Sequence, residues 1–111
     1  MNNINYFTIK EKLIEKVISK EYVDDEMIEY PNDFSTTCAS EIIKIFKSKK
    51  FYPATFTPSL DGGFITEFFI ENNYNIIEIF NENTIVFIEN NLPAQEYTFQ
   101  EISDKLNILL N

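Results

Sequence analysis

The chain of 111 residues has no histidine and no tryptophan, only two glycines and a single cysteine. Without histidine there is no Cys–His nucleophile, and a common zinc ligand is missing. One Gly-Gly pair does not make a glycine-rich phosphate loop. The lone thiol, Cys38, excludes an internal disulfide and is typical of a reducing compartment. These absences argue against an enzyme, and the sequence predicts no cofactor and no metal.

Long apolar runs are also missing. No stretch approaches the ~20 apolar residues of a membrane helix. The start of the chain, "MNNINYFTIKEKLIEK", lacks the basic residues and the unbroken apolar run of a signal peptide. Hydrophobic residues make up 44% of the chain and aromatics 15%, enough for one compact core. We therefore expect a soluble, cytoplasmic, single-domain protein over residues 1–111, from a bacterium or a mobile element.

Basic residues are scarce in the second half. Residues 1–50 contain nine acids and eight bases, whereas residues 51–111 contain nine acids and one base, Lys105. Eight of the nine net negative charges therefore follow residue 50. Such a field repels nucleic acid and attracts basic surfaces. Solubility explains the same charge equally well.

Three amphipathic segments predict helices at about 8–22, 37–50 and 98–110. Thr8 with Glu11, and Thr98 with Glu101, have the spacing of capping boxes at the first and third helix. Cys38 falls near the first turn of the second helix, where a thiol pKa can be lowered. A buried, inert thiol is the other interpretation, and the lack of histidine favours it.

The connection between the first two helices is acidic. Asp24, Asp25, Glu26 and Glu29 lie within six residues. Hard cations bind clustered oxygens, but the glycine and the closing glutamate of an EF-hand are missing. The pattern favours a plain acidic loop.

Alternating apolar segments at 54–59, 64–71, 74–80 and 84–89 predict four strands. The turns between them are short: "LDGG", Asn72–Asn73 and "NEN". Short turns join antiparallel neighbours. The expected fold class is α+β, a four-stranded antiparallel meander packed with three helices.

With Asn72–Asn73 as the loop, Glu67 faces Glu78 across the hairpin. Like charges in that arrangement cost up to ~1 kcal/mol. Either a basic partner neutralises the pair, or water screens it, or the register is shifted. The opposite face carries Phe64, Phe68 and Ile77 and is expected to meet the helices. The partner-binding residues predicted on this basis are Asp61, Glu67, Phe69, Glu71, Glu78 and Phe80.

The middle of the chain resembles a widespread family of small uncharacterised bacterial α+β proteins, often encoded as one half of a two-gene cassette. The resemblance covers residues 31–88 and implies a fold and a partner protein rather than an activity. The tryptophan expected after the turn is absent, and Phe68 or Phe69 stands in its place. The residues that carry the resemblance are Pro31, Ala39, Ile42, Ile43, Pro53, the "TPSLDGG" turn, Glu67 and Glu78.

Three functions remain. The first is an acidic interaction module, antitoxin-like or immunity-like, that masks a basic protein. The second is a phage-type anti-defence inhibitor that mimics nucleic acid by its carboxylates. The third is a homo-oligomer that pairs exposed strand edges. An acid/base role for Glu67 and Glu78 lacks a predicted cleft. Direct nucleic-acid binding and membrane binding are not expected.

Overall fold

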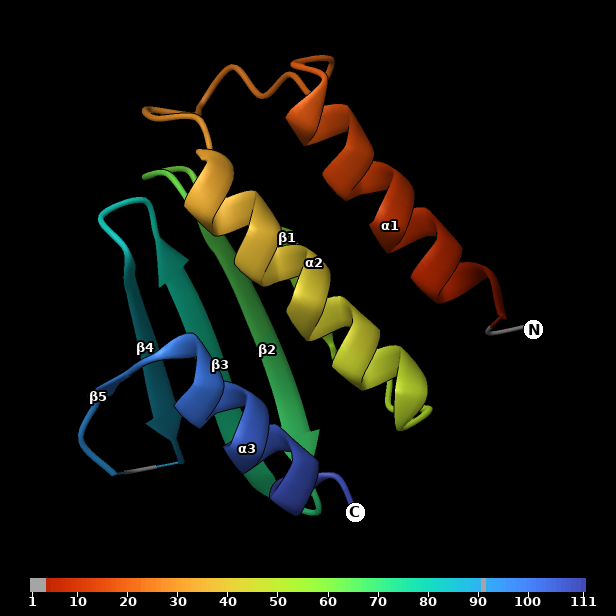
Figure 1. Cartoon of the computed structure of the whole chain (residues 1–111), viewed down its shortest axis with the longest axis vertical. Coiled ribbons are helices and arrows are strands. Elements are labelled where there is room, and N and C mark those ends of the chain that lie inside the picture. The colour runs from red at the N-terminus through yellow and green to blue at the C-terminus, as the bar shows by residue number, and fades with distance from the viewer. Residues whose placement is uncertain (1–3, 91) are drawn as a thin grey trace.

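A computed structural model describes residues 4–90 and 92–111. Its three helices all lie on one face of an antiparallel sheet (Figure 1). The α+β class and the antiparallel sheet are therefore confirmed, but the sheet has five strands rather than four. The elements are α1 (Ile4–Ile18), α2 (Asp33–Ser48), β1 (Thr55–Pro58), β2 (Phe64–Ile70), β3 (Asn73–Phe80), β4 (Thr84–Glu89), β5 (Gln95–Tyr97) and α3 (Phe99–Leu109).

The strands follow one another in space in the order β1-β2-β3-β4-β5, so the sheet is a meander. The side chains alternate strictly along each strand, and the inner face meets the helices. Together they form a two-layer molecule that is only 23 Å thick along its shortest axis. The inner face contributes these buried side chains to the core: Phe56, Phe64, Thr66, Phe68, Asn75, Ile77, Ile79, Ile85 and Phe87.

The opposite face of the sheet, here called the outer face, is covered by none of the three described helices. Its strand residues are mostly half-buried by their neighbours. The assignment of side chains to the two faces agrees with the sequence pattern. The outer face consists of Thr55, Thr57, Ile65, Glu67, Phe69, Tyr74, Ile76, Glu78, Phe80, Thr84, Val86, Ile88 and Glu96.

The register of the β2–β3 hairpin differs from the prediction. The loop is Glu71–Asn72, and Ile70 pairs with Asn73. Glu71 takes the left-handed conformation with φ 58° that the sequence assigned to an asparagine. Moving the loop back by one residue shifts every pairing by two. Such a shift leaves each side chain on its predicted face but changes its cross-strand partner.

Helix α1 begins earlier than predicted, which places Thr8 inside the helix and makes the predicted Thr8–Glu11 capping box wrong. The earlier start buries Phe7 in the core. The helix ends at Ile18 because Lys20 adopts φ 66°. The Glu21 amide then donates to the Lys16 carbonyl at 2.9 Å, and the Lys20 amide donates to the Val17 carbonyl at 3.1 Å. This pair of bonds is a Schellman motif with lysine at the position that glycine usually takes.

Helix α2 also ends in a Schellman motif, and it begins at a residue that the sequence did not predict. Its N-cap is Asn32, whose side chain accepts the Ser35 amide at 3.0 Å. At the other end Lys50 takes φ 54°, and the Phe51 amide donates to the Phe46 carbonyl at 2.9 Å. The predicted helix of 37–50 is thus displaced by two to four residues.

Helix α3 agrees closely with its prediction. The Thr98 side chain accepts the Glu101 amide, and the Glu101 carboxylate accepts the Thr98 amide at 2.8 Å. The predicted capping box is confirmed. The strand β5 immediately before it was predicted as a connection.

Candidate functional site

The outer face combines apolar side chains with carboxylates, and none of the described helices covers it (Figure 1). Phe69 is 53% exposed and packs beside Tyr74, with ring centroids 5.2 Å apart. Ile65, Ile76 and Phe80 lie between the charged positions and are half-buried. A surface of this composition resembles the mixed apolar and polar character of protein interfaces.

Glu67 sits in the middle of this face and is held in place by hydrogen bonds. The Thr55 hydroxyl donates to one carboxylate oxygen at 3.0 Å, and the Tyr74 hydroxyl donates to the other. The Thr55 hydroxyl oxygen also accepts the Glu67 amide at 3.0 Å. The bond to Glu67, followed by burial and the nearby negative charge, raises the pKa of Tyr74. The carboxylate is thus fixed in orientation.

The predicted opposition of Glu67 and Glu78 is wrong. Because of the shifted register, Glu67 faces Ile76 and Glu78 faces Ile65. The acidic neighbour of Glu78 is instead Asp61, in the turn between β1 and β2. Burial between apolar neighbours raises the pKa of Glu78, and the Asp61 charge raises it further.

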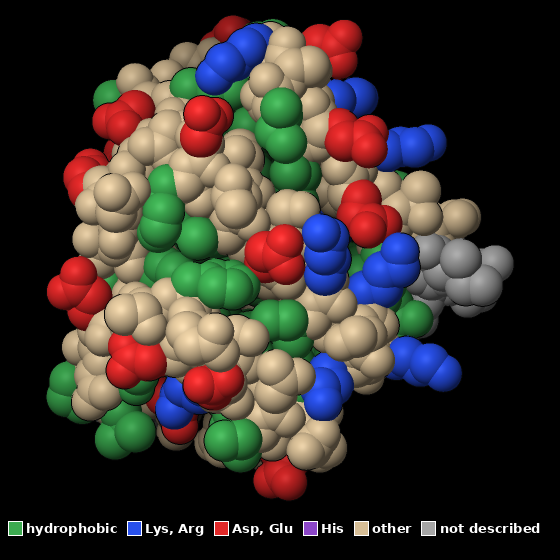
Figure 2. All heavy atoms as spheres, viewed as in Figure 1, with side chains coloured by type: hydrophobic (Ala, Val, Ile, Leu, Met, Phe, Trp, Pro, Cys, Tyr) green, Lys and Arg blue, Asp and Glu red, His purple; other side chains and the backbone are tan. Residues whose placement is uncertain are grey.

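The carboxylates of the outer face have no ion-pair partner within the described ranges 4–90 and 92–111. The three ion pairs there join Lys44 to Glu41, Lys47 to Glu11 and Lys105 to Glu89. On the helix side of the molecule, lysine side chains lie mainly over α1 and α2 (Figure 2). Among the described residues, no cation pairs with these carboxylates to compensate the negative field of the outer face.

Four of the six predicted site residues share the outer face: Glu67, Phe69, Glu78 and Phe80. Asp61 lies close to Glu78. Glu71 is exposed in the hairpin turn at the far end of β2 and β3, roughly 20 Å from Glu78 at ~3.4 Å per strand residue. The structure therefore places four of the six on one face, with Asp61 at one end of that face beside Glu78 and Glu71 in the turn at the other end, two residues after Phe69.

Sequence reasoning missed the part of this surface contributed by β4 and β5. Val86 and Ile88 point to the outer face, and Glu96 lies beside Val86. The alternation of side chains in "TIVFIE" could have identified Val86 and Ile88 as outer-face residues. Glu96 was missed because β5 itself was not predicted.

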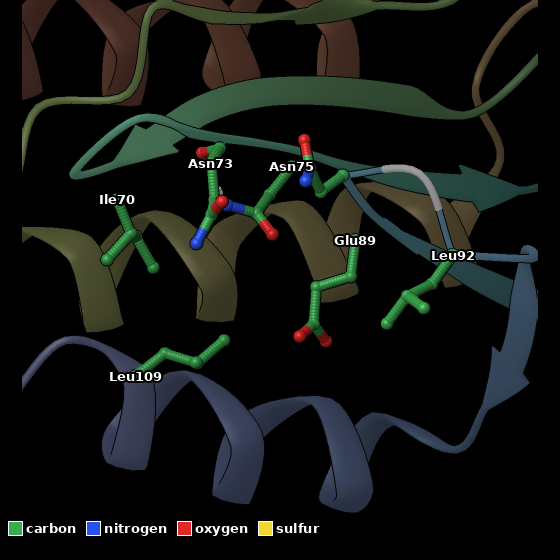
Figure 3. Close-up of a pocket in the computed structure, with 7 residues that line it drawn as sticks. Ile70, Asn73, Asn75, Glu89, Leu92 and Leu109 are labelled. Carbon is green, nitrogen blue, oxygen red and sulfur yellow. Dashed lines mark hydrogen bonds between the residues drawn. The ribbon is translucent and has the colours of Figure 1, made fainter.

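A pocket of about 230 Å³ lies on the other side of the sheet, beneath the end of α3 (Figure 3). It is lined by Ile70, Asn73, Asn75, Glu89, Asn90, Leu92 and Leu109. Two of its polar side chains already have partners within the protein. Asn75 Nδ2 donates to the Asn73 carbonyl at 3.1 Å, and Glu89 pairs with Lys105 at 2.8 Å. The volume is also below the ~300 Å³ of ordinary ligand sites. The outer face is therefore the stronger candidate.

The lone thiol does not resemble a reactive site. Cys38 is buried in α2, five residues after the helix starts rather than in its first turn. Burial, with the Glu41 charge, raises the pKa of Cys38 to about 11, which is opposite to the lowered pKa considered from sequence. Such a thiol is almost wholly protonated at neutral pH.

Across the described residues, no three acidic or cysteine side chains are grouped so that they would hold a metal ion, and the acidic loop 24–29 is no exception. None of the described helices has the length and apolar character needed to cross a membrane. No family model, curated protein or solved structure matches the chain. The resemblance to small bacterial proteins over residues 31–88 stays a prediction.

Proposed function

We propose that this chain is an acidic protein–protein interaction module, antitoxin-like or immunity-like, whose outer face covers a basic surface of a partner protein. One observation carries the proposal. An uncovered sheet face presents Phe69, Ile76 and Phe80 among carboxylates that have no lysine partner in the described chain.

The two kinds of side chain serve different steps of association. Apolar burial supplies most of the affinity, whereas unpaired carboxylates accelerate the encounter with a basic surface and select against acidic ones. Glu67 is already oriented by Thr55 and Tyr74, so a lysine or arginine meets a preorganised acceptor.

Glu78 adds a dependence on pH. A cation placed next to Glu78 and Asp61 favours the ionised carboxylate and opposes the raised pKa of Glu78. Partner binding then releases the proton that Glu78 holds in part of the free protein. Affinity therefore rises as the pH increases toward and through the pKa of Glu78 in the free protein.

A host pull-down followed by kinetics tests the proposal. The tagged wild-type chain is compared with Asp61→Asn/Glu78→Gln, which removes two charges from the candidate surface. The matched control, Glu15→Gln/Asp104→Asn, removes two charges from the helix layer. Slower association of the first variant alone, with a strong dependence on salt, supports the proposal. Equal association rates for all three chains would contradict it.

The same surface suits a phage-type inhibitor of a basic host defence protein. Gene neighbourhood separates the two roles. A neighbouring gene for a small basic protein favours the immunity role. A location within a phage cluster of anti-defence genes favours the inhibitor role. In either case the partner is a basic protein.

A further inference from the structure

The loop between α1 and α2 carries apolar side chains that the core does not use. Among the described residues, Ile28 and Val23 are the most exposed large apolar side chains, at 82% and 80%. Both line a shallow depression of about 320 Å³, here called the loop hollow. Its lining is Tyr22, Val23, Asp24, Met27, Ile28 and Tyr30.

The apolar surface continues onto the turn between β1 and β2. The Leu60 carbonyl accepts the amides of Ile28 at 2.7 Å and Glu29 at 3.2 Å. The Leu60 side chain is 39% exposed. Two segments about thirty residues apart in the chain thus present one apolar edge.

Hydrogen bonds hold this edge in a fixed shape. Asn81 Nδ2 donates to the Glu29 carboxylate at 2.6 Å and to the Tyr30 carbonyl at 2.8 Å. The Met27 amide closes a turn on the Asp24 carbonyl at 3.0 Å. A surface fixed in advance loses little conformational entropy when a partner binds.

The charges around the loop hollow are almost all negative. Between Lys20 and Lys44 the chain has seven acids and no base. Lys20 borders the hollow, with its ammonium 4.6 Å from the Tyr30 ring centroid. Within the described part of the chain, no ion pair involves the acids of residues 24–29. These four acids, here called the acidic rim of the loop hollow, are Asp24, Asp25, Glu26 and Glu29.

The rim connects to the outer face. Glu29 and Asp61 form a backbone bridge, and the Asp61 charge acts on Glu78. Acidic groups therefore run from the loop hollow around the end of the sheet to the outer face, and none of the ion pairs of the described residues involves them.

We propose that the loop hollow and Leu60 receive a basic amphipathic segment of the same partner protein. Its apolar side chains pack on Ile28, Val23 and Leu60, and its lysines or arginines meet the acidic rim. An amphipathic helix binding through spaced apolar residues has this chemistry. The inference rests on the proposed function and extends the contact surface of that partner beyond the sheet. Acidic partners and anionic lipid surfaces are repelled by the rim, and a second copy carries the same net charge of −9.

The test uses a defined probe. A fluorescent synthetic helical peptide with leucines on one face and lysines on the other is titrated with the full chain, and binding is read by anisotropy. A peptide with glutamates in place of the lysines is the charge control. Val23→Asn/Ile28→Asn is the test variant, and Ile108→Asn is its control, because Ile108 is 75% exposed on α3. Asp61→Asn/Glu78→Gln tests the outer face separately.

We expect the lysine peptide to bind and the glutamate peptide not to bind. Val23→Asn/Ile28→Asn should weaken binding about tenfold, as expected when apolar anchors are lost, while Ile108→Asn should leave it unchanged. Amide shifts in NMR spectra should map to residues 22–30 and 60.

Several results would overturn the inference. They are failure of the lysine peptide to bind, equal binding of the glutamate peptide, equal losses from the loop and Ile108 variants, or self-association abolished by Val23→Asn/Ile28→Asn. Weakening by Asp61→Asn/Glu78→Gln but not by the loop variant would reject the loop hollow and keep the proposed function. Weakening by the loop variant alone would support the hollow and would leave the outer face to the kinetic test of the proposed function.

Discussion

Asn32 donates two hydrogen bonds to Asn81 across 49 residues of sequence. The Asn32 amide donates to Asn81 Oδ1 at 2.9 Å, and Asn32 Nδ2 donates to the Asn81 carbonyl at 2.8 Å. The Ser35 hydroxyl also donates to Asn81 Oδ1, at 2.7 Å. Since Asn32 caps α2, one side chain in the β3–β4 turn joins the start of that helix to the sheet.

Asn81→Ala should therefore destabilise the fold by about 2–3 kcal/mol, because the partly buried Ser35 hydroxyl and Tyr30 carbonyl lose their partner together with the exposed Asn32 amide and Glu29 carboxylate. Urea unfolding measures the change. Glu82→Ala, in the same turn and exposed, is the control and should cost little. Similar losses for both variants would mean that the Asn81 network adds nothing beyond the turn itself.

The two glycines of the β1–β2 turn should respond unequally to alanine. A Cβ on Gly63 would lie 1.7 Å from the Ile79 carbonyl oxygen, which is backbone of the neighbouring strand. A Cβ on Gly62 would meet the ends of the Asn81 and Glu29 side chains at 2.6 and 3.0 Å. These are side-chain ends rather than backbone, but moving them disturbs the hydrogen bond that Asn81 donates to Glu29. Both residues have positive φ, which alone costs an alanine about 1–2 kcal/mol.

Gly63→Ala should thus cost about 3 kcal/mol or more, since overpacking against backbone adds to the conformational cost. Gly62→Ala should cost less: about 1–2 kcal/mol for its conformation, plus the part of the Asn81 network that the new Cβ displaces. Thermal and urea denaturation of the two variants show which one loses more unfolding free energy. A larger loss at Gly62 would show that the close approach of Gly63 to β3 is wrong.

Phe68 and Phe69 are adjacent in β2 but lie on opposite faces. Phe68 is completely buried, whereas Phe69 is 53% exposed on the outer face. Around Phe68 lie the rings of Phe46, Phe51 and Phe87. Phe68→Ala should cost about 3–5 kcal/mol, and Phe69→Ala clearly less. Comparable losses in urea unfolding would mean that something covers the outer face.

The faces of the strands were predictable, but their register was not. Alternating side chains identify Phe64, Phe68 and Ile77 as inner whether the hairpin loop is 71–72 or 72–73. The choice between these loops depended on whether Glu71 or an asparagine took positive φ, and propensity favoured the asparagine. The nearness of Asp61 to Glu78 depends on the register and on the turn geometry, so it could not be predicted from the sequence either.

Helix ends and the last strand were missed for a related reason. In a chain with two glycines, Lys20 and Lys50 occupy the left-handed positions that end α1 and α2. Lysine gives no sequence signal for such a position. The three residues of β5 are too few and too polar to show alternation, and only their pairing with β4 identifies them.

The pH dependence of stability should reveal the environment of Glu78. Burial and the Asp61 charge raise the pKa of Glu78 in the folded state, so the folded protein holds this proton more tightly than the unfolded chain does. The contribution of Glu78 therefore favours folding at low pH. It is lost as the pH rises from the ordinary glutamate value of about 4.3 through the raised folded value. Above that window, ionised Glu78 destabilises the fold.

Glu78→Gln should remove this dependence and make the protein more stable than wild type at neutral pH. Asp61→Asn should narrow the pH range over which stability changes. It removes the second cause of the raised Glu78 pKa, the Asp61 charge, but leaves the first, burial. NMR titration of the Glu78 side chain gives the pKa directly, and urea unfolding at several pH values gives the stability. If Glu78→Gln destabilises the neutral protein, or Asp61→Asn leaves the titration of Glu78 unchanged, the carboxylate pair at the end of the outer face is not arranged as described. A fold that becomes more stable when Glu78 is neutralised is consistent with the proposed basic partner, because a cation beside Glu78 and Asp61 would relieve the same unfavourable charge.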